Sequence, residues 1–246
     1  MEEDCLKKLV EALELNSNCS LAHCNLKIID ENSERVPTLD WYAFPAQQYF
    51  KEETKTFHIR KAPLCGLLYF THQTIIHSFT QLLIKKDVFD IVGYFMEDQG
   101  AEADLEWGMR TLFSENIVHV PFEMATWRMH DEQLTQIRPD TQKQKHLMSL
   151  QIKAVEHAVI DDNFRESILK NSILLQTRSL KEFYSRCSLP EKLLSRLCLK
   201  YKLFLWRHPD IKKVLNNENN YFDFIFGMLM KQHRNTFVIG AKTHTE

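Results

Sequence analysis

The first half of the chain alternates between helical and strand-like spacing of its hydrophobic residues. Apolar positions three and four residues apart predict a helix over residues 4–15, and the looser alternation over residues 21–29 predicts a strand. A turn-prone Asp30–Ser33 segment closes this strand. The other predicted elements are strands at 66–70 and 117–120 (the latter ended by Pro121), helices at 72–84, 86–91 and 104–113, and an irregular aromatic segment at 36–55. This order predicts a mixed α/β fold.

The second half of the chain has helical periodicity and no strand-like alternation before its tail. The predicted helices cover residues 141–160, 164–186, 190–207 and 221–233. We therefore expect two regions, an α/β domain at residues 1–138 and an all-α helical extension at residues 139–246.

Composition narrows the class of protein. A chain of 246 residues that is 44% hydrophobic can bury a substantial core. Its 31 basic and 33 acidic residues give a net charge of −2, which argues against nonspecific nucleic-acid binding. No apolar run approaches the roughly 20 residues of a membrane-spanning helix, and the acidic start Met-Glu-Glu-Asp is unlike a signal peptide. We expect a cytoplasmic location.

Several kinds of site lack the residue pattern that they need. The six cysteines are scattered without a Cys-x-x-Cys pair, so buried free thiols are expected rather than a zinc site. The six glycines form no phosphate-binding loop, and no His-Glu-x-x-His or Ser/His/Asp set supports a hydrolase.

Residues 93–135 carry the most informative chemistry. Asp104, an acid that we predict to be buried, begins the helix expected at 104–113. The helix dipole favours an ionised acid at this position, where a general base could take a proton from an acceptor hydroxyl. The alternative is an N-cap, because Asp is among the best capping residues.

An Arg-x-His pair follows the strand expected at 117–120. Alternate positions on an extended segment point the same way, so Arg128 and His130 can face one ligand together. The alternative is that Arg128 pairs with Asp131 or Glu132 while the histidine lies free on the surface.

Two motifs resemble the acceptor-side half of family-2 glycosyltransferases with the GT-A fold. One is the Ala103-Asp104 step with Trp107 and Arg110 after it, and the other is Trp127-Arg128-Met129-His130. The resemblance covers residues 1–136 and implies a partial GT-A-like mixed sheet with helices.

The resemblance also implies roles for individual residues. Asp104 would be the catalytic base of an inverting sugar transfer, with Asp98 and Glu102 as its nearest competitors. Arg128 and His130 would face the diphosphate, and His130 would lie at the Mg²⁺ or Mn²⁺ ion. The residues expected to bind substrate are Asp98, Glu102, Trp107, Arg110, Trp127, Arg128 and His130. The substrates would be a nucleoside-diphosphate sugar and a sugar or lipid-linked acceptor.

The sequence departs from this family at the metal-binding Asp-x-Asp motif, which is absent along with the nucleotide-binding half that carries it. A truncated gene, a protein partner that supplies the missing half, and a degenerate relic would each explain the departure. The alternative function is a non-catalytic binding or scaffold protein that recruits a partner through residues 36–55 and the helical extension.

A membrane surface is a weaker candidate partner. The predicted helix at 190–207 interleaves basic residues with apolar and aromatic ones. This pattern is typical of a helix on an anionic membrane, and also of a packed helix with extended basic side chains at its rim. We therefore expect a cytoplasmic protein, with a peripheral membrane location as the variant.

Overall fold

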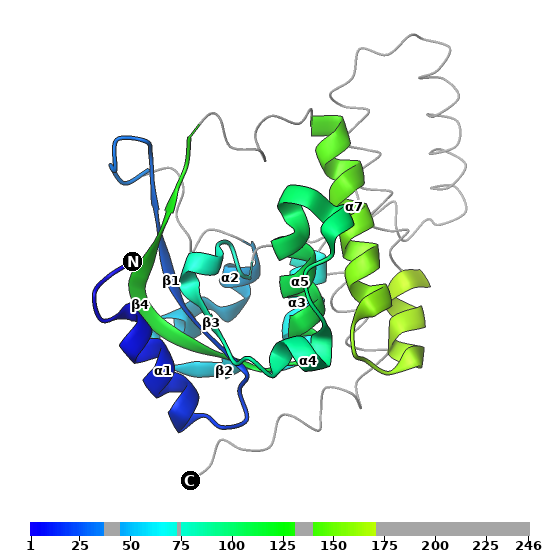
Figure 1. Ribbon diagram of the computed structural model, residues 1–246, viewed down its shortest axis with the longest axis horizontal. Coiled ribbons are helices and arrows are strands. Elements are labelled where there is room, and N and C mark those ends of the chain that lie inside the picture. The colour runs from blue at the N-terminus through cyan, green and yellow to red at the C-terminus, as the bar shows by residue number, and fades with distance from the viewer. Residues whose placement is uncertain (37–44, 73–74, 131–139, 171–246) are drawn as a thin grey trace.

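A mixed four-stranded sheet is the centre of the molecule. The computed structural model describes residues 1–36, 45–72, 75–130 and 140–170 (Figure 1). The strands are β1 (Leu21–Ile29), β2 (His58–Arg60), β3 (Leu82–Ile84) and β4 (Ile117–Arg128), in the order β2-β4-β1-β3. The central pair β1 and β4 is parallel, and each outer strand pairs antiparallel with its neighbour. The predicted α/β class and mixed sheet are confirmed.

Helix α1 (Cys5–Leu15) covers one face of the sheet. Its residues Cys5 and Leu9 pack in one cluster with Ala22 and Cys24 of β1 and Val118 of β4. Since successive residues of a strand point to opposite faces, the residues between these belong to the other side. The predicted helix at 4–15 and strand at 21–29 are confirmed.

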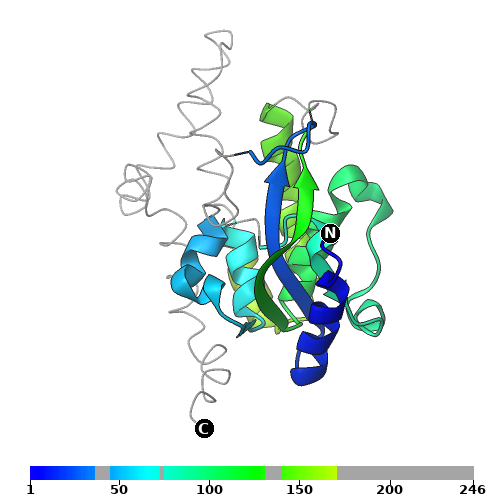
Figure 2. The ribbon, with the colours of Figure 1, turned by 90° about the vertical axis from the view of Figure 1, so that its left-hand side faces the viewer.

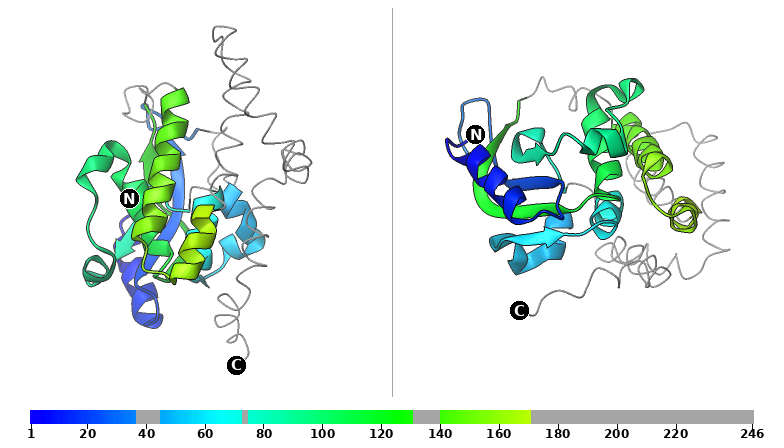
Figure 3. Two further views of the ribbon diagram at one scale, coloured as in Figure 1. Left: turned by 90° about the vertical axis from the view of Figure 1, so that its right-hand side faces the viewer. Right: turned by 60° about the horizontal axis from the view of Figure 1, so that its bottom comes forward.

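Three helices pack together on the other side of the sheet (Figures 1 and 3). The helical elements after α1 are α2 (Pro45–Phe50), η2 (Lys51–Lys55), α3 (Leu64–His72), η3 (Phe79–Gln81), α4 (Val88–Val92), η4 (Glu97–Glu102), α5 (Ala103–Leu112) and α7 (Asp140–His157). Ala154 and Val155 of α7 share a core cluster with Leu68 of α3 and Leu112 of α5. Residues 162–170 are helical and add Phe164 to the same core. The helical extension therefore begins with segments that pack directly on the α/β part.

The segment predicted as a strand at 66–70 lies inside helix α3, so this prediction was wrong. Its residues are buried on every side, and such an apolar run shows no helical period that could distinguish it from a buried strand. The helix predicted at 72–84 was also wrong, since η3 and β3 occupy the described end of that range. The aromatic segment predicted to be irregular is helical at 45–55.

Strand β4 continues past Pro121, where the sequence predicted its end. The pairing register with β1 shifts at this point, because Cys24 lies opposite Val120 whereas Asn25 lies opposite Glu123. Pro121 falls in the bulge, and β2 pairs only with residues 117–119. The proline has no N–H to donate, and at this position in the bulge it does not need to form a hydrogen bond with a neighbouring strand.

Candidate active site

The carboxyl ends of the parallel strands β1 and β4 lie side by side, with Ile29 opposite Arg128. Open α/β sheets bind ligands beyond such strand ends. The Arg128 guanidinium donates to the carbonyl oxygens of Asp30 (3.0 Å) and Glu31 (2.9 Å) and to Ser33 Oγ (3.0 Å). Arg128 therefore holds the turn at residues 30–33, which was predicted to follow β1, against the end of β4. Asp131 and Glu132, the alternative ion-pair partners, are outside the described residues.

Trp127 contributes a half-buried indole at the same strand end. The ring of His77 meets it edge-on with 4.2 Å between ring centroids. Burial lowers the pKa of His77 to about 4, so the imidazole is neutral at physiological pH. Thr80 Oγ1 donates to the carbonyl of Thr126 at 3.3 Å and fixes the 77–81 segment on β4. The partly exposed indole is placed to stack on a flat apolar ligand face.

Asp104 lies in the first turn of α5 and is exposed, which corrects the prediction that it is buried. One carboxylate oxygen accepts the Leu105 N–H at 2.7 Å, but Asp104 is not the N-cap predicted as the alternative, because Glu102 occupies that position and a cap accepts from a residue two or three further on. Protein atoms around the carboxyl nevertheless replace part of its hydration. This desolvation raises the pKa of Asp104, and the charge of Glu102 raises it further. Among the described residues, no cation lies within ion-pair distance of Asp104.

The two neighbouring acids are both paired with helix α7. Lys153 Nζ lies 2.5 Å from Asp98 Oδ2, and this hydrogen bond lowers the pKa of Asp98. His146 Nε2 lies 3.2 Å from Glu102 Oε2 in a mostly buried contact that lacks hydrogen-bond geometry and is an ion pair only when the imidazole is protonated. Of the three candidate acids, Asp104 is thus the one without a contact to the described side chains of α7.

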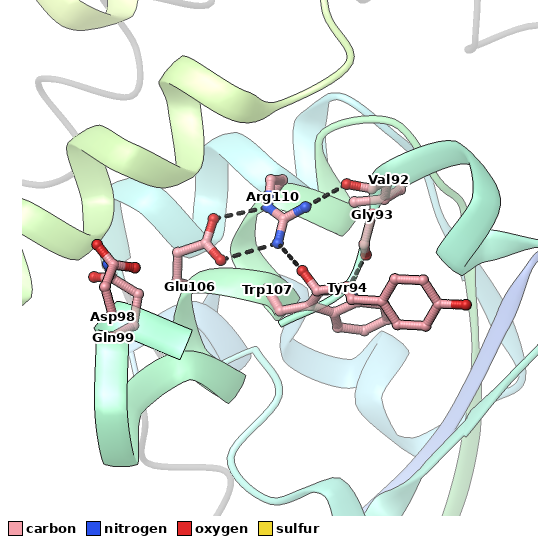
Figure 4. A network of polar contacts seen from close by, with 8 residues as sticks. All are labelled: Val92, Gly93, Tyr94, Asp98, Gln99, Glu106, Trp107 and Arg110. Atoms are coloured by element: carbon pink, nitrogen blue, oxygen red, sulfur yellow. Dashed lines mark hydrogen bonds and ion pairs between the residues drawn. The ribbon is translucent and has the colours of Figure 1, made fainter. Parts of the chain in front are cut away.

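Trp107 and Arg110 are inside the core (Figure 4). Trp107 is fully buried, donates its indole N–H to the Gly93 carbonyl at 2.8 Å and stacks on Phe89. Arg110 donates to Glu106 Oε1 at 2.7 Å and to the Tyr94 carbonyl at 2.9 Å. Both side chains tie α5 to the preceding loop and do not reach solvent. The described contacts therefore give them a structural role in place of the predicted substrate contact.

His130 is exposed just beyond β4. The described residues contain no group of three His, Cys, Asp or Glu side chains that could hold a metal ion. Mg²⁺ and Mn²⁺ prefer several oxygen ligands, which one imidazole does not supply. The described residues alone do not fit the predicted metal, and its remaining ligands would have to come from elsewhere.

A polar cluster that sequence reasoning missed is buried in the sheet. His23 of β1 and His119 of β4 are both fully buried, with 3.1 Å between His23 Nε2 and His119 Nδ1. Arg60 of β2 joins them and is 1% exposed. The available signal was a histidine in the middle of each apolar strand, Leu-Ala-His-Cys and Ile-Val-His-Val.

The cysteines of the described part match their prediction. Cys5, Cys19, Cys24 and Cys65 are free and buried. Burial raises the pKa of Cys65 to about 12, so this thiol is protonated and unreactive. Cys187 and Cys198 are outside the described residues.

A scan of protein-family models finds none that matches the chain, and a search of curated proteins finds no match either. Within the part of the chain that the structure describes, no helix has both the length and the apolar character needed to cross a membrane.

Proposed function

We propose that the chain is the acceptor-side part of an inverting glycosyltransferase, with Asp104 as its general base. The proposal rests on a difference in the contacts of three neighbouring acids, Asp98, Glu102 and Asp104. Helix α7 places a cationic or imidazole group on Asp98 and on Glu102, whereas Asp104 is exposed and has no such partner among the side chains that the structure describes. A base must be accessible and must not be neutralised by a resident ion pair.

The surroundings of Asp104 suit proton transfer. Partial desolvation raises the pKa of its carboxyl, which makes the carboxylate a stronger base. Attachment to the first turn of α5 fixes its position. In the proposed reaction, Asp104 takes the proton of the acceptor hydroxyl as that oxygen attacks the anomeric carbon. The bond from this carbon to the nucleoside diphosphate breaks at the same time.

The strand ends supply the remaining contacts of the proposal. The half-buried face of Trp127 would stack on a sugar ring, and exposed Arg128 and His130 would face the diphosphate. A bound Mg²⁺ or Mn²⁺ would neutralise charge on the leaving diphosphate. The nucleotide-binding half and most metal ligands would come from a protein partner or from further sequence. We propose a cytoplasmic location; residues 190–207, the candidate membrane contact, are outside the described part.

A second candidate is a non-catalytic binding or scaffold protein. It is favoured by an exposed aromatic pair, Phe57 and Phe122, whose rings meet at 5.7 Å, with the ammonium of Lys8 at 4.9 Å from the Phe122 ring. This candidate predicts tight association with another polypeptide and no affinity for sugar nucleotides.

Calorimetric titration distinguishes the two functions. The full chain with Mn²⁺ would be titrated with UDP, GDP, CDP and dTDP and with their sugars, alone and together with the nucleotide-binding half of a family-2 enzyme. Saturable binding of one nucleotide supports the transferase. No binding in either setting, from protein that circular dichroism shows to be folded, would favour the scaffold.

A further inference from the structure

A closed polar cluster joins residues 45–60 to the central sheet. Figure 2 shows this segment and α1 on opposite sides of β1 and β4. The sheet and η3 contribute His23, His119 and Gln81, and the segment contributes Gln47, Thr54, His58 and Arg60. All of these side chains are at most 3% exposed apart from His58, which is half-buried.

The hydrogen bonds define where the protons of His119 lie. Its Nε2 is 2.8 Å from the carbonyl oxygen of Thr54, and a carbonyl only accepts, so this nitrogen carries the hydrogen. Nδ1 of the neutral ring is then an acceptor. It receives an Arg60 N–H at 3.3 Å and the His23 Nε2–H at 3.1 Å. One ring nitrogen thus accepts from two donors.

The same assignment extends through the cluster. His23 uses Nδ1 to accept from Gln81 Nε2 at 3.5 Å. His58 donates from Nδ1 to the Thr56 carbonyl at 3.0 Å, so its Nε2 accepts from Arg60 Nε at 3.1 Å. All three histidines are therefore neutral, with one consistent set of protons.

Arg60 is the one charged group at the centre of these bonds. It also donates to Gln47 Oε1 at 3.0 Å and lies 3.9 Å above the centre of the Phe50 ring. The other titratable groups near the cluster are the Cys65 thiol on α3, which burial keeps protonated, and Glu53 on η2. Glu53 is exposed, so solvent screens its charge.

An added proton would disrupt this arrangement. A hydrogen on His119 Nδ1 would face two other donors, and the new charge would lie 3.3 Å from the Arg60 guanidinium in a buried site. Buried charges that lack a counter-ion are strongly unfavourable. Separation of the 45–60 segment from the sheet would hydrate the imidazoles and remove the conflict.

We propose that the His23–His119–Arg60 cluster is a proton-sensitive latch, which holds residues 45–60 on the sheet at neutral pH and releases them on acidification. Strand β2 pairs with β4 over three residue pairs, and Phe50 and Ile59 of the segment pack against the two core clusters. Local opening of such a segment costs less than global unfolding.

The direction and range of the effect follow from linkage. Burial, with Arg60 as a further cause, lowers the pKa of His119 to about 2 and that of His23 well below 6.5. The open state regains the ordinary value near 6.5 and binds protons that the closed state excludes. Stability of the closed state is therefore retained above pH 6.5 and falls below it. With two histidines coupled, the opening equilibrium constant should rise about a hundredfold from pH 7.5 to pH 5.5.

Amide hydrogen exchange of the full chain at pH 7.5 and pH 5.5 tests the latch, after correction for the intrinsic rates. The expected result is loss of protection in residues 45–60 while the β1 and β4 peptides keep theirs. Equal protection at the two values, or loss in step with β1 and β4, would overturn the proposal without any variant.

A matched pair of variants tests whether His119 is the residue that responds to acid. His119→Gln keeps an acceptor for Arg60 and a donor for the Thr54 carbonyl but does not titrate, so it should reduce the acid-induced opening about tenfold. His77→Gln, the control, removes a half-buried histidine that lies outside the cluster, and it should leave the opening of residues 45–60 unchanged. Full acid opening in a folded His119→Gln variant would overturn the assignment.

Discussion

Glu106 and Arg110 form a buried ion pair one turn apart on α5, with 2.7 Å between Glu106 Oε1 and Arg110 Nε. Arg110 also donates to the backbone carbonyls of Val92 and Tyr94 (Figure 4). The pair thus fixes the loop that leads into the candidate site. It is the structural basis for the position of α5, and hence of Asp104.

Glu106→Gln should strongly destabilise the fold, because it leaves the buried Arg110 charge without its carboxylate. Loss of one partner of a buried pair costs about 3–5 kcal/mol in the free energy of unfolding. Urea denaturation monitored by tryptophan fluorescence would measure it. The control is Glu11→Gln, which removes an exposed pair with Lys7 at 3.9 Å and should cost less than about 1 kcal/mol. Similar effects of the two changes would contradict the structural role of Glu106.

Gly66→Ala should also destabilise the protein, since the new Cβ would lie 2.5 Å from the backbone nitrogen of Phe113. Overpacking of this kind costs about 1–3 kcal/mol. Gly108→Ala is the matched control, because its Cβ would meet nothing closer than 3.4 Å and alanine favours a helix by about 1 kcal/mol. Thermal unfolding should therefore shift in opposite directions for the two variants. A neutral Gly66→Ala would mean that α3 and α5 are not in close contact there.

Replacement of Asp104 should reveal a conflict between function and stability. Folding raises the pKa of this carboxyl, so the group is unfavourable to the folded state once pH exceeds its folded pKa. Asp104→Asn should consequently be at least as stable as the wild type at pH 7. This advantage should disappear below the unfolded value of about 3.9.

Asp98→Asn is the comparison variant, because folding lowers the pKa of Asp98 whereas it raises the pKa of Asp104. The Lys153 hydrogen bond lowers the pKa of Asp98, so its contribution is present above the unfolded value and is lost as pH falls through the folded one. Asp98→Asn should be no more stable than the wild type at pH 7. Stability measured by denaturation between pH 3 and pH 7 would check both variants. A lower stability of Asp104→Asn at pH 7 would contradict the desolvation of this carboxyl.

Elements that bury one face were predictable from the sequence. Helix α1 shows its period because one side of it contains the buried residues, whereas strand β1, which is buried on both faces, was predicted from its loose alternation of apolar and polar residues and the turn after it. Helix α3 has apolar residues on all sides, so its period is hidden. Strand β3 follows a capping box in which Gln81 bonds back to the 77–78 backbone, and this depends on tertiary contacts with β1. Such contacts have no local signal.

The candidate site was predictable as a set of residues but not as an arrangement. The position of Asp104 at a helix start follows from the local pattern. Its exposure, and the pairing of Asp98 and Glu102 with α7, depend on contacts between distant segments. The same holds for His23 and His119, which are 96 residues apart in sequence and meet through parallel pairing of β1 and β4.

The central claim is that Asp104 is the base of a sugar transfer. Its most direct test is the kcat for transfer from the nucleotide sugar that calorimetry selects, measured with the full chain and a nucleotide-binding half. Asp104→Asn should lower kcat by about 10²–10⁴-fold with binding retained, because general-base catalysis contributes that much. Glu102 is two residues before Asp104 and lies against His146. The Glu102→Gln variant should therefore keep a kcat near the wild-type value. Wild-type turnover by Asp104→Asn would contradict the account.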